Sequence, residues 1–184
     1  MDEERMGRTD PAWPVLETET EYDTGWYTGG YDLVEQPDGS TKRYYWAQLS
    51  PAVVIVAVVD EEIIMVEQYR PTTREHHLEL PAGIVESGES LIDAARRELQ
   101  EETGMAAGGL SVLQEMWVAT GVLRHRRAVV FAEGLEPVSQ DLDDNEFLEV
   151  RTVPVAEAMS RARAPPANES TLGALLLARA DGLL

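Results

Sequence analysis

Two periods of apolar residues alternate along this chain, and together they predict a mixed α/β fold. Residues 51–59 (PAVVIVAVV) form an unbroken, largely β-branched run, which is typical of a strand buried on both faces. Residues 63–70 (IIMVEQYR) predict a second strand after an acidic turn. Further strands are expected at 110–120 and 127–135, with a loop between them.

The helical period is clearest in residues 91–103 (LIDAARRELQEET), where apolar residues recur every three or four positions. Ser90 is the expected N-cap of this helix, and Gly104 is the expected residue just past its end. Two more helices are predicted at 155–163 and 171–180. A sheet with helices packed against it therefore accounts for the pattern.

The N-terminal part of the chain has a different character. Residues 1–14 are expected to form an acidic arm, and residues 27–49 contain two half-alternating runs joined by the turn residues Pro37, Asp38 and Gly39. These runs predict an antiparallel hairpin. We therefore expect two parts: an N-terminal arm and hairpin at 1–50, suited to dimerisation, and a main domain at 51–184.

The charge of the chain narrows the classes of function. It carries 34 acidic residues against 15 lysines and arginines, a formal net charge of −19. This excludes a duplex nucleic-acid binder, which needs cationic surface to displace counterions. No apolar run approaches the ~18 residues of a membrane span, and the polar N-terminus is unlike a secretory signal peptide. The absence of cysteine is compatible with a reducing cytoplasm, which is the expected location.

The basic residues are almost all arginine, and Lys42 is the only lysine. Many carboxylates with so little lysine are typical of proteins from a high-salt cytoplasm, where the short Debye length screens self-repulsion. We therefore expect a halophilic protein. The alternative is a merely acidic protein from a GC-rich genome.

The predicted helix at 91–103 crowds three carboxylates. Glu98, Glu101 and Glu102 fall beside its apolar stripe, at the rim of the core, where like charges three and four residues apart repel. Carboxylates packed so closely in a partly dry site either raise their pKa values or hold a cation. Hard divalent ions such as Mg²⁺ take oxygen ligands of this kind.

This region resembles the Nudix box at every fixed position: Gly83, Glu89, and the run RELQEETGM from Arg97 to Met105. The resemblance implies the Nudix fold, a mixed sheet sandwiched between helices. It also implies hydrolysis, dependent on Mg²⁺ or Mn²⁺, of a nucleoside diphosphate linked to another group. The residues are spread over one loop and one helix, so the match is far more specific than a short motif.

The resemblance also implies roles for individual residues. Glu98 and Glu102 correspond to direct metal ligands, and Glu101 corresponds to a ligand or to the base that orients water. The backbone carbonyl of Ala82 matches a further metal ligand of relatives. Arg97 and Glu89 correspond to residues that orient these ligands.

Similarity to the ADP-ribose pyrophosphatase branch of this superfamily covers roughly residues 27–179, and VEQYRP at 66–71 and LELPAG at 78–83 carry it. The branch implies ADP-ribose or a related nucleoside diphosphate sugar as substrate, and Arg70 as a phosphate ligand. It also implies a catalytic base in the loop DLDDNE, where Glu146 is the first candidate, ahead of Asp143 and Asp144.

The chain departs from the branch after the box. A serine-proline-glycine turn followed by acidic residues is replaced by residues 119–121 (ATG) and a basic cluster at 124–127 (RHRR). Arg124 and Arg126 are candidates for contact with a substrate phosphate or sugar. The alternative is that these side chains pair with acidic neighbours, and this departure leaves the identity of the sugar open.

Relatives use their N-terminal segment as a dimer interface, so the resemblance also implies a homodimer that acts on a small nucleotide. Two alternatives stay open. One is hydrolysis of another nucleotide sugar or of a dinucleotide. The other is a sensor that binds such a metabolite without cleaving it, against which the intact Glu98, Glu101 and Glu102 argue.

Overall fold

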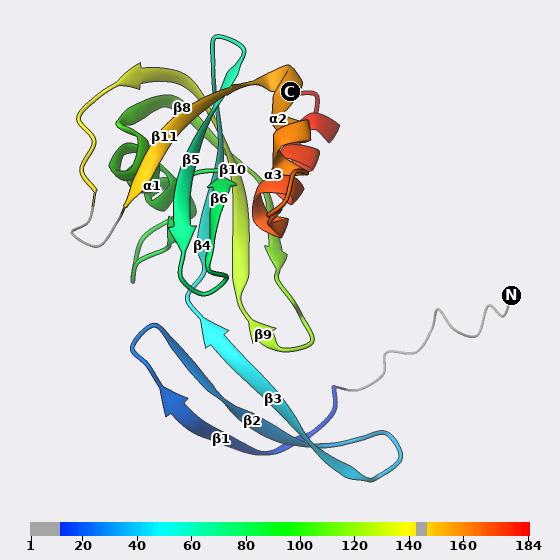
Figure 1. Cartoon of the computed structure of the whole chain (residues 1–184). Coiled ribbons are helices and arrows are strands. Elements are labelled where there is room, and N and C mark those ends of the chain that lie inside the picture. The colour runs from blue at the N-terminus through cyan, green and yellow to red at the C-terminus, as the bar shows by residue number, and fades with distance from the viewer. Residues whose placement is uncertain (1–11, 143–146) are drawn as a thin grey trace, which may run out of the picture. The chain divides into compact units, whose positions relative to one another are not determined.

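The structure is a computed structural model that describes residues 12–142 and 147–184 (Figure 1). It divides into two compact units. The N-terminal unit comprises the residues up to Leu49 together with Ala119–Arg124. The main unit comprises Ser50–Val118 and His125–Leu184.

The N-terminal unit is a four-stranded sheet in the order β1-β2-β3-β9. Its strands are β1 (Val15–Asp23), β2 (Tyr27–Glu35), β3 (Thr41–Leu49) and β9 (Leu123–Arg124). The predicted hairpin is confirmed as β2 and β3, which pair antiparallel around a turn in which Gly39 has a φ of 82°. Strand β1 was not predicted, because its residues are exposed throughout and show no apolar period.

The main unit is built on a seven-stranded mixed sheet whose continuous path runs β11-β5-β4-β10-β8. Strands β10 and β4 are parallel, and the other neighbours on this path are antiparallel. Strand β6 pairs with β5, and β7 pairs with β4. The strands are β4 (Ala52–Val59), β5 (Glu62–Arg70), β6 (Glu75–Glu79), β7 (Ala82–Ile84), β8 (Met105–Trp117), β10 (Arg126–Pro137) and β11 (Leu148–Pro154).

Helices cover both faces of this sheet: α1 (Leu91–Thr103) lies on one face, and α2 (Val155–Ala162) with α3 (Glu169–Ala180) on the other (Figure 1). Strand β4 shows why, because its alternate residues enter two separate cores. Val53 and Ile55 pack with α1, whereas Val54 and Val56 pack with α2 and α3. The predicted sandwich of a mixed sheet between helices is confirmed.

Helix α1 begins and ends as predicted. The Ser90 hydroxyl accepts a hydrogen bond from the Asp93 amide at 3.1 Å, and Gly104 adopts a left-handed conformation with φ of 67°. Strand β8 starts at Met105, directly after the helix and earlier than expected. Its first residues, AAGG, have little intrinsic strand preference, and pairing with β10 decides their conformation.

Candidate active site

The three carboxylates of α1 differ in their exposure. Glu98 and Glu102 are buried, with 7% and 4% of their surface exposed, whereas the side chain of Glu101 is 34% exposed. The helical spacing explains this, because Glu98 and Glu102 lie one turn apart next to the buried Leu99. The sequence predicted Glu98 and Glu102 at the rim of the core, but in the structure both are buried.

Arg97 connects these carboxylates to the loop before the helix. Its Nη1 donates to Glu98 Oε1 at 2.7 Å and to Glu101 Oε2 at 2.9 Å. Its Nε and Nη2 donate to the two oxygens of Glu89, each at 3.1 Å, and Nη2 also donates to the Ile84 carbonyl at 2.8 Å. One guanidinium thus fixes three carboxylates.

These contacts change the protonation equilibria of the pair Arg97 and Glu89. The hydrogen bonds from Arg97 hold the pKa of Glu89 below its usual range, aided by the Glu86 amide, which donates at 3.0 Å. Glu89, with smaller contributions from Glu98 and Glu101, raises the pKa of Arg97. Both groups therefore stay charged at neutral pH, and each orients the other.

The glycine loop forms a wall against which the carboxylates pack. A Cβ atom on Gly83 would lie 1.9 Å from the Glu98 carboxylate carbon, so only glycine lets that carboxylate approach the backbone. Next to it, the Ala82 amide donates to Glu102 Oε2 at 2.9 Å. Ala82, Gly83, Glu98 and Glu102 are therefore brought together, although they come from a strand and a helix.

A hollow of about 260 Å³ opens beside this cluster. Its lining residues are Asp93, Arg96, Arg97, Gln100, Glu101 and Asp141. The Asp141 amide donates to the Glu101 carbonyl at 3.3 Å, so the acidic segment after β10 runs along α1. Asp141 was not among the candidates for the catalytic base, although it is the first residue of the segment DLDDNE from which those candidates came. Glu146, Asp143 and Asp144 lie outside the described residues.

The donor set fits a hard divalent cation. It consists of the carboxylate oxygens of Glu98, Glu101 and Glu102 beside a backbone wall that has no Cβ at Gly83, and carboxylate oxygens are ligands that Mg²⁺ and Mn²⁺ prefer. Among residues 12–142 and 147–184, no three acidic or histidine side chains converge on a single ion as they stand. In this arrangement Glu98 and Glu101 accept hydrogen bonds from Arg97, and Glu102 accepts one from the Ala82 amide.

The other predicted site residues lie in ion pairs. Arg70 donates to Glu79, with 2.6 Å between Nη2 and Oε2. Arg124 pairs with Asp32 and stacks over Trp46 at 4.1 Å from the ring centre.

Arg126, from the same basic cluster, lies 3.4 Å from Glu115. Between these two arginines His125 is buried and bonds to the Ser50 carbonyl at 2.8 Å, and burial lowers its pKa. Arg124 and Arg126 thus have acidic neighbours, as one of the two alternatives for this cluster expected. Their contact with substrate stays a prediction.

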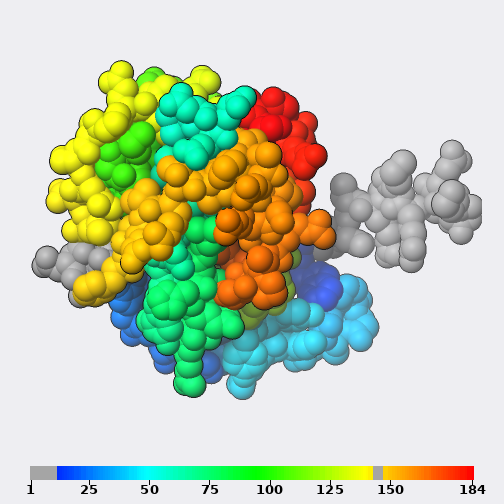
Figure 2. All heavy atoms as spheres, turned by 45° about the horizontal axis from the view of Figure 1, so that its top comes forward, coloured from blue at the N-terminus to red at the C-terminus, as the bar shows by residue number. Residues whose placement is uncertain are grey.

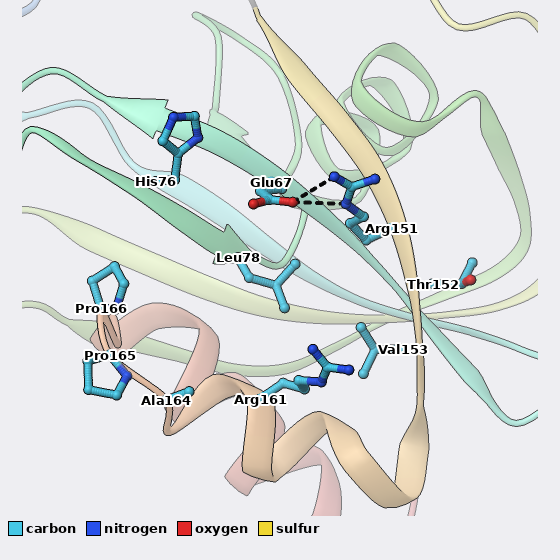
Figure 3. Close-up of a pocket in the computed structure, with 10 residues that line it drawn as sticks. All are labelled: Glu67, His76, Leu78, Arg151, Thr152, Val153, Arg161, Ala164, Pro165 and Pro166. Carbon is cyan, nitrogen blue, oxygen red and sulfur yellow. Dashed lines mark hydrogen bonds and ion pairs between the residues drawn. The ribbon is translucent and has the colours of Figure 1, made fainter.

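A second hollow, of about 400 Å³, lies on the α2 face of the main unit, between β5, β6, β11 and α2 (Figure 3). Figure 2 shows this surface, with β11 and α2 in orange beside β5 and β6 in teal and green. Arg151 donates from Nε to Glu67 at 2.9 Å, and its Nη2 lies 2.6 Å from Glu149. Its charge is therefore already balanced, on the face of the sheet opposite α1.

The fold and the carboxylate cluster define the class of the protein. The chain belongs to the NUDIX domain family, whose model matches residues 48–174, from the end of β3 to the middle of α3. It is a Nudix hydrolase.

Particular relatives refine this assignment. The chain is 34% identical over 129 residues to the ADP compounds hydrolase NudE of Escherichia coli (strain K12), covering 70% of this chain and 69% of the relative. It is 36% identical over 129 residues to the ADP-ribose pyrophosphatase of Bacillus subtilis (strain 168), covering 68% and 70%. A crystal structure of an ADP compounds hydrolase superposes with a TM-score of 0.86 at 28% identity, covering 97% of this chain and 100% of the other.

Proposed function

We propose that this protein hydrolyses the pyrophosphate bond of ADP-ribose or of a related nucleoside diphosphate sugar, releasing a nucleoside monophosphate and a sugar phosphate. The observation that carries the proposal is the cluster of Glu98, Glu101 and Glu102 around Arg97, in a chain of this family. The relatives named for ADP-ribose and ADP compounds supply the substrate class.

The proposal assigns Mg²⁺ or Mn²⁺ to Glu98, Glu101, Glu102 and the Ala82 carbonyl. The bound ion would neutralise the diphosphate and lower the pKa of its water. Arg97 and Glu89 orient the carboxylates, because their hydrogen bonds fix Glu98 and Glu101 before substrate arrives.

The remaining roles are proposed for residues around this cluster. Either Glu101, which lines the hollow at α1, or Glu146 takes the proton from the attacking water. Arg70 binds a phosphate, and Arg124, in β9, and Arg126, at the start of β10, would contact a phosphate or the sugar of the substrate. The last assignment requires those two side chains to exchange their acidic partners for substrate.

We also propose that the protein is a homodimer assembled through the N-terminal unit. All nine residues of β1 are exposed, and the same unit exposes large apolar side chains that a second copy would cover. They include Trp13, Leu16, Tyr22, Trp26 and Tyr45. Sedimentation of the wild type and of Trp26→Ser with Tyr45→Ser tests this, and a wild-type monomer would overturn it.

The proposed setting is a high-salt cytoplasm. The net charge of −19 supports it, because salt screens the repulsion among surface carboxylates. None of the helices in the described part of the chain has the length and apolar character that a membrane crossing requires. Unfolding measured across a range of KCl tests the halophilic proposal, and full stability in dilute buffer would contradict it.

A panel of nucleotides tests the activity. ADP-ribose, other nucleoside diphosphate sugars and dinucleotides are incubated with Mg²⁺, with Mn²⁺ and with a chelator, and the released monophosphate is measured. We expect metal-dependent release of AMP and a sugar phosphate from ADP-ribose. Binding of these compounds without turnover would favour a sensor over an enzyme. Faster turnover of another nucleotide than of ADP-ribose would show that ADP-ribose is not the preferred substrate.

A further inference from the structure

Arg70, at the end of β5, has a long side chain that is 43% exposed, yet the structure fixes it on one side. Its Nε and Nη2 both donate to the same oxygen, Oε2 of Glu79, at 2.9 and 2.6 Å. Within the described residues, Nη1 has no hydrogen-bond partner. The guanidinium is therefore held by one edge and offers the other to an anion.

Glu79 is itself held at both carboxylate oxygens. Its side chain is only 12% exposed, and Oε2 accepts a further hydrogen bond from Gln68 at 3.0 Å. Oε1 accepts from the Asn168 side-chain amide at 2.9 Å. The carboxylate also interacts with the half-buried Arg127, whose pKa burial lowers. A carboxylate that accepts hydrogen bonds from three side chains is fixed in its orientation.

Asn168 connects this carboxylate to helix α3. Its Oδ1 accepts from the Thr171 amide at 2.8 Å, which makes it the N-cap of α3, while its Nδ2 reaches Glu79. In the same turn the Thr171 hydroxyl accepts from the Leu80 amide at 3.1 Å. The first turn of α3 therefore holds two successive residues of the strand end, Glu79 and Leu80.

The held segment leads directly to the carboxylate cluster. Ala82, three positions after Glu79, donates to Glu102 from its backbone amide. We infer that Glu79 and Asn168 are positioning residues, which aim Arg70 at the substrate diphosphate next to the Glu98 and Glu102 site. This inference rests on the proposed hydrolysis of a nucleoside diphosphate.

A double-mutant cycle tests the role of Glu79. Glu79→Gln should raise the KM for ADP-ribose about tenfold in the wild-type background, with kcat within about twofold, because a charge-assisted contact to Arg70 is lost. In an Arg70→Ala background the same substitution should change KM little, because Glu79 acts through Arg70. Glu67→Gln, which alters the ion pair on the opposite face, is the matched control and should leave KM unchanged.

Two variants of Asn168 separate positioning from helix capping. Asn168→Ser and Asn168→Asp both keep a good N-cap, so the urea-unfolding midpoint should stay close to that of the wild type. Serine removes the donor to Glu79, whereas aspartate places a like charge beside it. We therefore expect KM to rise in the order wild type, Asn168→Ser, Asn168→Asp.

The outcomes distinguish the inference from the proposed function. Binding of ADP-ribose in Ca²⁺ is measured by calorimetry beside turnover in Mg²⁺, so that affinity is read without the reaction. Additive effects of Glu79→Gln and Arg70→Ala, or equal KM values for both Asn168 variants and the wild type, would overturn the positioning role and leave the hydrolysis standing. A wild type that neither binds nor cleaves any nucleoside diphosphate would overturn both.

Discussion

The two arginines Arg97 and Arg151 lie on opposite faces of one sheet, and each holds more than one carboxylate. The side chain of Arg97 is 26% exposed, and the side chains of its partners Glu89 and Glu98 are 15% and 9% exposed. Arg151 is 47% exposed, and its partners Glu67 and Glu149 are 40% and 71% exposed. The hydrogen-bond lengths are similar, so the environment is what separates the two clusters.

Water decides what each cluster contributes. Around Arg151 the solvent screens the charges and competes for the hydrogen bonds, so such pairs are worth about 0–1 kcal/mol. Around Arg97 the carboxylates have lost part of their hydration, and separating them from the guanidinium leaves charge uncompensated. The Arg151 ion pairs are therefore expected to contribute little to stability, whereas the partly buried Arg97 ion pairs are expected to contribute substantially.

The largest expected difference between the faces is in catalysis. Glu102→Gln should lower kcat at least ~100-fold, because it removes the charge of a proposed metal ligand. Its fold should persist, since removing one of three crowded carboxylates relieves repulsion. Glu149→Gln in the Arg151 cluster should keep the wild-type rate. Equal activity of both variants would show that Glu102 is no metal ligand.

Stability is the next contrast. Arg97→Met should lower the free energy of unfolding by about 2–3 kcal/mol, because three carboxylates lose their common donor. Arg151→Met should cost less than about 1 kcal/mol. Urea unfolding in a chelator measures both losses, and added Mg²⁺ should stabilise both variants by binding the folded state, because both keep the three carboxylates. Equal losses of unfolding free energy in Arg97→Met and Arg151→Met would show that burial does not make the Arg97 cluster the more stabilising of the two.

The wall behind the Arg97 cluster gives a smaller effect. Gly83→Ala forces the Glu98 carboxylate to move, and we expect a cost of about 1–3 kcal/mol together with reduced activity. Gly173→Ala is the control, because its Cβ would meet nothing within 4 Å in α3. That substitution should stabilise the protein by up to about 1 kcal/mol through helix propensity. A harmless Gly83→Ala would contradict the close packing of Glu98.

Features of this structure that depend on residues close together in the sequence could be predicted from the sequence. Helix α1 was predicted with both of its ends, because Ser90 and Gly104 act within one turn of the chain. The buried strand β4 was predicted because a run of β-branched residues has few other stable settings. The spacing of Glu98, Glu101 and Glu102 likewise follows from helical geometry alone.

Contacts between residues that are far apart in the sequence could not be predicted. Residues 119–124 belong to the N-terminal unit because β9 pairs with β3, and no local pattern marks a two-residue strand. The contact of Gly83 with Glu98 depends on how β7 lies against α1. Asn168 reaches Glu79 across 89 positions, and only the packing of α3 against the sheet sets that distance. All three depend on contacts between elements that are distant in the sequence, which no local pattern predicts.

The smallest expected effect is a difference in pH dependence. Arg97 lowers the pKa of Glu89 in the folded protein below its ordinary value of 4.5. The unfolded chain therefore binds more protons in this range, so the stabilisation is complete above the unfolded pKa and is lost as pH falls through the folded value. Between about pH 5 and pH 3, Glu89→Gln should lose stability less steeply than the wild type in chelator-treated samples.

The Arg97→Met background completes this experiment. Without its donor, Glu89 no longer differs between the folded and unfolded chain through this contact, so Glu89→Gln should leave the pH slope of Arg97→Met unchanged. The urea midpoint at each pH gives the four slopes directly. Should Glu89→Gln flatten the slope equally in both backgrounds, the source of the shift lies in the loop amide of Glu86 and not in Arg97. The Glu86 amide would then contribute more than the Arg97 guanidinium to keeping Glu89 ionised in the folded protein.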